Sequence, residues 1–281
     1  MTFTQPSELE IAIRKIAGRS PVGSILGSAE WQDVPVALRD RAFFSATIEN
    51  ARFLNTAQSF LNDFLRNTRE TLPSGETALK ADGRARFIAG MQQLAIEEGI
   101  GPIGKIQDKS VRDIRSNARL GLIFDTQVRS AYHYGNWRSG LTGPILEAFP
   151  AQKFVRYPGA KVKRPLHERN EGQIRLKSDL KFWLEMNSRE IGGFGVPWGP
   201  WGYNSWMDVR DVGRKQAVAL GLIREDQKPK PIEAHDFNHE LQASVSDLTP
   251  DLIEKLKDVF GYQVRLNGDV LEWALADLTN D

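Results

Sequence analysis

The sequence predicts an α+β fold with a mainly helical N-terminal region, a central mixed α/β domain and a small C-terminal unit of one helix and a β-hairpin. Three observations support this fold class. Apolar residues recur at helical spacings through the first half of the chain. Two short segments of alternating polarity follow, and an Asn-Gly pair separates two more near the C-terminus. The predicted domains are residues 1–107, 108–224 and 225–281.

Helical signals dominate the N-terminal region. Ser7 to Glu10 has the spacing of a capping box, and a short apolar face follows it until Gly18. The next helix is predicted from Pro35 to about Thr71, with a break near Asn55. The remaining helical segments are 79–99 and a segment that begins at Ser110.

Strand signals begin in the central domain. Residues 153–157 and 173–177 alternate in polarity and are bounded by proline or glycine. We expect these two strands to pair across the basic segment that separates them. They form the small sheet of the central domain. Met207 to Leu222 has helical spacing and is predicted as one helix.

The C-terminal unit follows a polar linker. Thr249-Pro250-Asp251 is typical of a helix start, and Gly261 is expected to end that helix. Asn267-Gly268 favours a two-residue type I′ turn, because both of its central positions need positive φ. The flanking strands of this hairpin are predicted at 262–266 and 269–273.

The composition excludes several classes of protein. The chain contains no cysteine, which excludes disulfides, thiolate metal sites and thiol nucleophiles and is compatible with a reducing cytoplasm. No apolar run approaches the roughly 18 residues that a membrane span needs. The first residues lack the charged and apolar regions of a signal peptide, so we expect no export by that route.

Charge is unevenly distributed although the net charge is only +1. Between residues 153 and 177 there are eight basic residues and two acidic ones. Residues 233–281 contain eleven acidic and three basic residues. This polarity would attract a phosphate backbone or an acidic partner to the basic segment. The alternative is that these charges are solvated or paired within the fold. The basic residues are Lys153, Arg156, Lys161, Lys163, Arg164, Arg169, Arg175 and Lys177.

A loop rich in glycine, proline and tryptophan extends from Gly192 to Trp206. This density of glycine and proline disfavours a long helix or a central strand. Two interpretations remain open for its rings, which are those of Trp198, Trp201, Tyr203 and Trp206. In the first interpretation, these rings form stacking platforms for single-stranded nucleic acid beside the basic segment. Alternatively, they fill the core against the small sheet, with Asn204 bonded to the backbone.

The order of these motifs resembles the bacteriophage Mu F-like head-morphogenesis, or minor head, protein family over roughly residues 108–222. The resemblance begins at Ala118-Arg-Leu-Gly-Leu-Ile-Phe-Asp-Thr-Gln127 and Ala131-Tyr-His-Tyr-Gly135, and it ends with Val209-Arg-Asp-Val-Gly-Arg214. Between them lie Arg164-Pro-Leu-His167, the Phe182-Trp183 pair and the loop from Pro197 to Ser205. The motif residues are Arg164, His167, Gly172, Trp183, Pro197, Trp198, Gly202, Tyr203, Asn204 and Trp206.

The resemblance implies a structural role in head assembly. It implies contact with portal and capsid or scaffold proteins, leaves contact with phage DNA open, and brings no catalytic residue or cofactor. It also implies assembly in the bacterial host cytoplasm and a place in the virion head. Many members have cysteines near the end of this domain, in a pattern suggestive of metal binding. This chain has none, so a metal site is not transferred.

The alternatives are a phage-encoded nuclease or transferase effector and a DNA-binding accessory protein. The candidate residues for an enzyme are His167, Asp179 and His235. His235 and His239 have the i,i+4 spacing of zinc ligands, but aspartate follows His235 where a metalloprotease has glutamate. No plausible nucleophile accompanies His167, so we expect it to bond a backbone carbonyl near Trp183. Accordingly, no catalytic or metal-binding residue is assigned.

Overall fold

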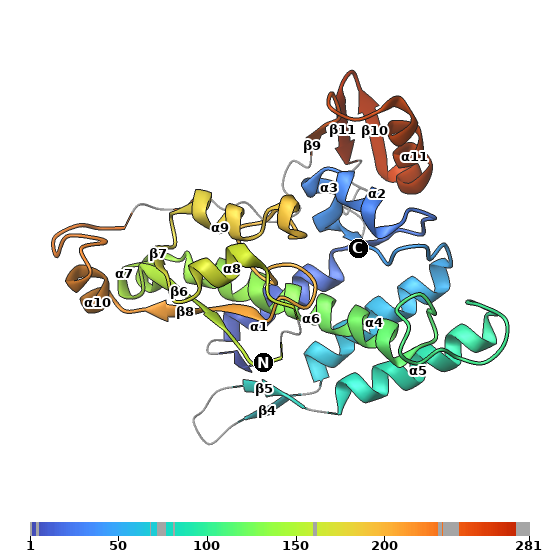
Figure 1. The fold of residues 1–281 in the computed structure, drawn as a ribbon, viewed down its shortest axis with the longest axis horizontal. Coiled ribbons are helices and arrows are strands. Elements are labelled where there is room, and N and C mark those ends of the chain that lie inside the picture. Colours follow the sequence, from blue (N-terminus) through green and yellow to red (C-terminus); the bar gives the residue numbers. More distant parts are fainter. Residues whose placement is uncertain are drawn as a thin grey trace, which may run out of the picture. The chain divides into compact units, whose positions relative to one another are not determined.

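The computed structural model describes residues 2–3, 6–67, 69–71, 77–80, 82–159, 162–229, 232 and 242–273. Helices and small sheets make up an α+β fold, which confirms the predicted class (Figure 1). The chain divides into two compact units, each assembled from three separate segments. Unit 1 comprises residues 1–14, 68–80 and 125–234, and unit 2 comprises residues 15–67, 81–124 and 235–281.

The elements alternate between helices and very short strands. The helices are α1 (Pro6–Ala17), α2 (Ser28–Asp33), α3 (Val36–Arg41), α4 (Ala51–Asn67), α5 (Gly83–Glu97), α6 (Asn117–Gly140), α7 (Gly143–Ala148), α8 (Pro165–Asn170), α9 (Leu180–Met186), α10 (Arg214–Ala219) and α11 (Pro250–Phe260). The strands are β1 (Thr2–Phe3), β2 (Ser20–Pro21), β3 (Ala42–Phe43), β4 (Arg69–Thr71), β5 (Thr77–Leu79), β6 (Ala151–Arg156), β7 (Ile174–Leu176), β8 (Met207–Val212), β9 (Gln242–Ser244), β10 (Val264–Asn267) and β11 (Val270–Trp273).

Four small sheets connect these strands. Their strand orders are β1-β5-β4, β2-β3, β7-β6-β8 and β10-β11-β9. The β7-β6-β8 sheet belongs to unit 1 and is antiparallel throughout. It includes the two strands predicted near 153–157 and 173–177, whose mutual pairing is confirmed. Sheets this small need helices packed on them for stability.

The C-terminal helix and hairpin are confirmed in unit 2. Thr249 caps α11 by accepting a hydrogen bond from the Leu252 amide, and the helix ends at Phe260. In the hairpin Asn267 pairs with Val270, so the turn residues are Gly268 and Asp269. The turn is therefore one residue later than predicted, with Gly268 at φ 58°.

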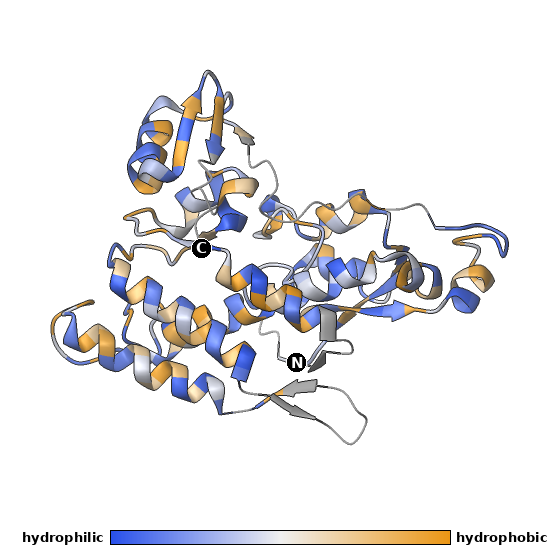
Figure 2. Cartoon of the chain, turned by 180° about the vertical axis from the view of Figure 1, so that it is seen from behind, coloured by the Kyte–Doolittle hydropathy of each residue, from blue (hydrophilic) through white to orange (hydrophobic). Residues whose placement is uncertain are grey.

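The predicted helix from Pro35 to Thr71 is wrong in its continuity. The structure has two helices in this range, α3 and α4. Strand β3 lies between them in the sequence and pairs with β2. Asn50 caps α4, because its Oδ1 atom accepts from the Phe53 amide at 2.8 Å. The interruption thus lies at residues 42–50, and Asn55 is inside α4. Figure 2 shows apolar and polar residues alternating around the helices, as expected for helices with one buried face.

The helix predicted to begin at Ser110 begins later, at Asn117. Asp113 is buried and accepts hydrogen bonds from the Gln107 amide and from Arg115, which keeps the preceding segment in a loop. The Ser116 hydroxyl accepts from the Arg119 amide at 2.9 Å. Short polar side chains bond local backbone more readily in loops and caps than inside helices, which explains the later start.

The helix predicted from Met207 to Leu222 is half wrong. Residues 207–212 form β8, the edge strand paired with all of β6, and only residues 214–219 are helical. Met207 and Val209 pack on the core of the small sheet, while Val212 joins a second apolar cluster with Ala217. Pairing with β6 overrode the helical spacing, since strand preference depends strongly on such tertiary context.

Candidate interaction surface around the aromatic loop

The aromatic loop packs against the small sheet of unit 1. Phe154 of β6 lies at the centre of a buried aromatic cluster, with Trp183 and Trp201 as its largest members. The Phe154 ring centroid is 5.3 Å from that of Trp201, nearly perpendicular to it, and the Trp183 and Trp201 centroids are 5.7 Å apart. The edge-to-face pair of Phe154 and Trp201 is favourable beyond the area that it buries. The Trp183 indole also donates to the Leu176 carbonyl at 2.9 Å.

His167 of α8 is fully buried beside this cluster. Its Nε2 atom lies 2.7 Å from the Met186 carbonyl oxygen, so the neutral ring carries its proton on Nε2 and donates it. Burial is the main cause that lowers the pKa of His167 to about 4. The ring is therefore uncharged near neutral pH and inaccessible to a substrate. This is the backbone hydrogen bond that the sequence predicted, formed at the end of α9.

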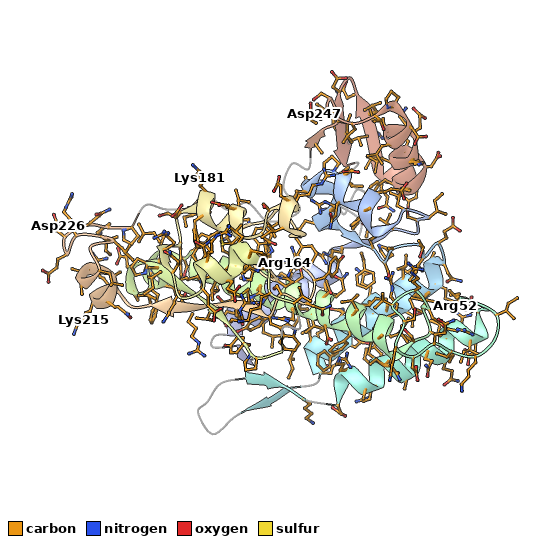
Figure 3. All side chains as sticks on the ribbon, in the orientation of Figure 1. Arg52, Arg164, Lys181, Lys215, Asp226 and Asp247 are labelled. Carbon is orange, nitrogen blue, oxygen red and sulfur yellow. The ribbon has the colours of Figure 1, made fainter. Side chains whose placement is uncertain are left out.

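Arg164 fastens the two ends of the loop. Its Nε atom donates to the Ile191 carbonyl at 2.7 Å, and another guanidinium nitrogen donates to the Tyr203 carbonyl at 2.9 Å. Gly202 has φ 91°, and a Cβ at that position would lie 2.8 Å from the Arg164 guanidinium. Arg164, labelled in Figure 3, thus uses two of its nitrogen atoms to hold the backbone of the loop.

Asn187, which is not among the residues predicted from the sequence, organises the interior of the loop. Its amide nitrogen donates to the carbonyl oxygens of Val196 and Trp198 at 2.9 and 2.7 Å. Its Oδ1 atom accepts from the Phe194 amide at 2.9 Å. The side chain is completely buried, so these bonds satisfy backbone groups that water does not reach. An asparagine directly after an apolar helix and before a glycine-rich run was the available signal.

The rings of the loop divide between the two interpretations left open by the sequence. Trp201 is buried and fills the core. Trp198 packs on Trp137 and Tyr134 of α6, with ring centroids 4.6 and 5.1 Å away. Tyr203 and Trp206 remain 41% and 37% exposed. The core interpretation therefore holds for Trp201, whereas Tyr203 and Trp206 belong to the surface.

The remaining motif residues shape turns. Gly172 has φ 85° and its amide donates to the Phe154 carbonyl at 2.7 Å, just before β7 begins. Asn204 has φ 53° and is exposed, in a conformation that asparagine tolerates better than most residues. Pro197 lies in the loop between Val196 and Trp198, whose carbonyls Asn187 holds.

Four of the eight residues of the basic segment form ion pairs within unit 1. The ion pairs are Arg156–Glu171 at 2.8 Å, Lys163–Glu168 at 3.3 Å, Arg175–Asp179 at 3.9 Å and Lys177–Asp211 at 3.0 Å. Lys153 and Arg169 are exposed and have no ion pair with any described residue. Lys161 lies outside the described residues. Half of the predicted run of eight cations is thus paired with acidic residues, and Arg164 is bound to backbone carbonyls.

The enzyme candidates are not assembled into a site by the described residues. Asp179 caps α9 by accepting from the Phe182 amide at 3.2 Å, which is a structural role. His235 and His239 lie outside the described residues. Within the part of the chain that the structure describes, no group of three His, Cys, Asp or Glu side chains is placed to hold a metal ion. No described helix is long and apolar enough to cross a membrane.

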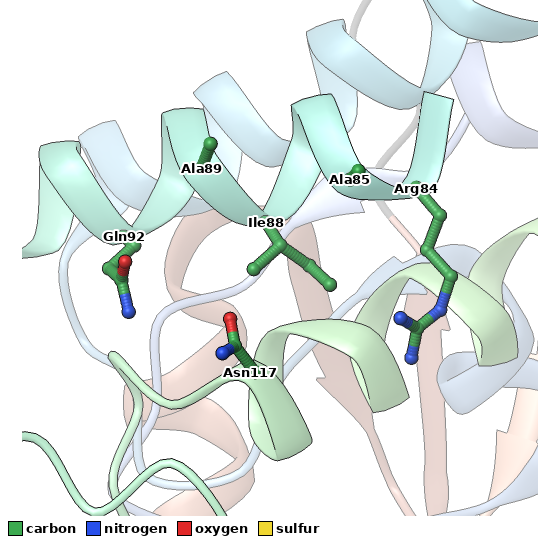
Figure 4. A pocket seen from close by; sticks show the side chains of 6 residues that line it. All are labelled: Arg84, Ala85, Ile88, Ala89, Gln92 and Asn117. Atoms are coloured by element: carbon green, nitrogen blue, oxygen red, sulfur yellow. The ribbon is translucent and has the colours of Figure 1, made fainter. Parts of the chain in front are cut away.

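A pocket of about 450 Å³ lies in unit 2, and none of the predicted site residues lines it. Figure 4 shows Ile88 and Gln92 of α5 pointing toward Asn117 at the start of α6. Gln92 also donates to the Arg115 carbonyl at 2.7 Å. The lining residues are Arg84, Ala85, Ile88, Ala89, Gln92 and Asn117, a set without a general base or nucleophile.

Comparisons with protein-family models, with curated proteins and with solved structures found no match for this chain.

Proposed function

We propose that the chain is a phage or prophage minor head protein that acts in head morphogenesis. The observation that carries the proposal is the ordered set of motifs from Ala118 to Arg214, with Arg164-Pro-Leu-His167 and the Pro197–Ser205 loop at its centre. The contacts of these residues support it. Arg164 and His167 bond the backbone on both sides of the loop, so the motif corresponds to one folded element.

The proposed partners are the portal protein and capsid or scaffold proteins, in a particle assembled in the bacterial host cytoplasm. Exposed rings on the loop support a docking role, because large apolar side chains on a rigid loop favour protein contacts. The enzyme alternative has less support, since His167 is buried and Asp179 serves as a helix cap.

The test is co-purification with the portal protein encoded beside this chain, followed by mass spectrometry of purified particles. We expect the chain in portal complexes and at a low copy number in particles. Tyr203→Ala removes an exposed ring and should weaken portal capture, whereas Tyr262→Ala removes an 88% exposed ring from unit 2 as a control. Absence of the chain from both portal complexes and particles would refute the proposal.

A further inference from the structure

Several cations of unit 1 have no ion pair with a described residue, and three of them lie near β6 and β8 of the small sheet. Arg129, Lys153 and Arg210 have no ion pair with any described residue, in contrast to the paired cations of the basic segment. Lys153 and Arg210 are exposed, and Arg129 is partly exposed. Two of these three residues lie outside the basic segment that the sequence identified. The folded chain therefore presents a different positive surface from the one expected.

The register of the sheet places two of these cations together. Lys153 of β6 is directly opposite Arg210 of β8, so both side chains leave the same face of the sheet. The Arg210 guanidinium lies over the Tyr157 ring, 5.8 Å from its centroid. Since β8 is an edge strand in the β7-β6-β8 order, this face continues to the margin of the sheet.

The third cation joins the same surface through Trp206. The Tyr157 amide donates to the Trp206 carbonyl at 2.9 Å, which holds the two aromatic residues side by side. The Arg129 guanidinium of α6 lies over the Trp206 ring at 5.5 Å from its centroid. One turn further along α6, the Nδ1 atom of His133 is 3.5 Å from the Oδ1 atom of Asp208 in β8, so α6 lies beside β8 here.

The aromatic rings hold the guanidinium groups in place. A guanidinium that lies over a ring loses side-chain freedom before any ligand arrives, and its N–H groups can still donate to a ligand. Gly159 approaches the Trp206 indole so closely that a Cβ there would lie 2.9 Å from a ring atom. With Gly159 and Arg129 both against this ring, Trp206 positions a cation and is not free to stack on a base.

We propose that Arg129, Lys153, Tyr157, Trp206 and Arg210, here called the cation–ring surface, bind the phosphate backbone of duplex DNA without reading its sequence. Fixed guanidinium edges match phosphate oxygens in bidentate geometry. A duplex offers phosphates at a regular repeat, so one ligand can meet all three cations, and backbone contacts alone carry no base information. The proposal goes beyond the minor head function and does not depend on portal binding.

The experiment measures binding of the full chain to a labelled duplex of about 30 base pairs by fluorescence anisotropy, between about 50 and 200 mM salt. The test variant is Arg129→Ala/Lys153→Ala/Arg210→Ala. The control is Lys109→Ala/Lys181→Ala/Lys215→Ala, which removes the same charge from exposed positions; Figure 3 shows Lys181 and Lys215 pointing outward. We expect the test variant to lose at least about tenfold in affinity. The salt slope, which is the slope of the logarithm of the binding constant against the logarithm of the salt concentration, should become about 2 to 3 less negative. The control should lose less than about threefold.

A second variant distinguishes the contribution of the planar guanidinium groups from that of their charge. Arg129→Lys/Arg210→Lys keeps both charges but removes the planar guanidinium, so affinity should fall while the salt slope stays close to that of the unchanged chain. Circular dichroism checks that each variant is folded. Equal losses in the test and control variants, or no binding by the unchanged chain at low salt, would overturn the proposal. Competition by polyglutamate as effective as that by DNA at equal charge would also overturn it, in favour of an acidic protein partner.

Discussion

The Nε2 atom of His167 donates its proton to the carbonyl oxygen of Met186 across 2.7 Å, and this bond joins α8 to the last residue of α9. Both groups are buried under the aromatic cluster, so neither has water as an alternative partner. The protonated ring could also donate this hydrogen bond, but burial penalises the charged form. That penalty lowers the pKa of His167 to about 4.

Acid should therefore destabilise the protein through His167. The unfolded residue has a pKa near 6.5 and the folded residue one near 4, so between these values the unfolded chain binds more protons and stability falls as pH falls. Burial lowers the pKa of His133 as well and adds in the same direction. His167→Gln keeps an amide donor but removes the titration, and should flatten the dependence of the urea midpoint on pH between about 4.5 and 6.5. An unchanged slope in this variant would contradict the assignment.

Asn187 should be the most sensitive polar position of the loop. Asn187→Ala removes the partners of two buried carbonyls and one amide, so we expect a loss of about 3 kcal/mol in the free energy of unfolding. Asn170→Ala is the matched control, since its amide makes a single bond to the Leu166 carbonyl at 2.8 Å. That change should cost about 1 kcal/mol. Urea unfolding monitored by tryptophan fluorescence measures both values, and equal costs would show that the loop does not depend on Asn187.

Sequence patterns predicted the elements whose signals are local. The Thr249 cap, the end of its helix before Gly261 and the hairpin near Gly268 all follow from nearest neighbours in the chain. Alternation also located β6 and β7, because Phe154 of β6 joins the aromatic cluster and Ile174 and Leu176 of β7 pack on the second apolar cluster. The His167 bond was predictable in kind, since a buried histidine without a nucleophile needs a carbonyl or a carboxylate as its partner.

Elements that depend on distant residues were not predictable. The segment 207–212 has helical spacing, but pairing with β6 makes it a strand. Arg129 and Arg210 are far apart in sequence, and only the packing of α6 beside β8 brings them to one surface. Asn187 was missed because its three acceptors and donors lie seven to eleven residues further along an irregular loop.

The ion pair between Lys177 and Asp211 should respond asymmetrically to mutation. The Lys177 side chain is 2% exposed and Asp211 is 34% exposed, with their charged atoms 3.0 Å apart. Asp211→Ala leaves a buried ammonium without its carboxylate and should cost about 2 kcal/mol, whereas Lys177→Met leaves a hydrated carboxylate and should cost less than about 1 kcal/mol.

The pH dependence distinguishes the two variants further. Burial already lowers the pKa of Lys177, and Asp211 opposes that effect. Without Asp211 the pKa falls further, so the unfolded chain binds more protons at alkaline pH and the stability of Asp211→Ala should rise with pH toward 10.5, the ordinary lysine value. Urea unfolding at several pH values measures this rise. A flat profile would show that the ammonium reaches water in the variant.

Two glycine-to-alanine changes should have opposite signs. A Cβ at Gly193 would overlap with the carbonyl groups of Asn187 and Ser188, and backbone atoms cannot move aside as a flexible side chain can. Gly193→Ala should therefore cost about 3 kcal/mol by displacing the loop. Gly90 lies inside α5 with nothing within 4 Å of an added Cβ. Gly90→Ala should stabilise the protein by about 0.5 to 1 kcal/mol, because alanine loses less backbone entropy in a helix. Thermal unfolding followed by circular dichroism measures the stability of both variants. Destabilisation by Gly90→Ala would contradict the helix assignment. A Gly193→Ala variant as stable as the unchanged chain would contradict the close approach of Gly193 to the carbonyl groups of Asn187 and Ser188.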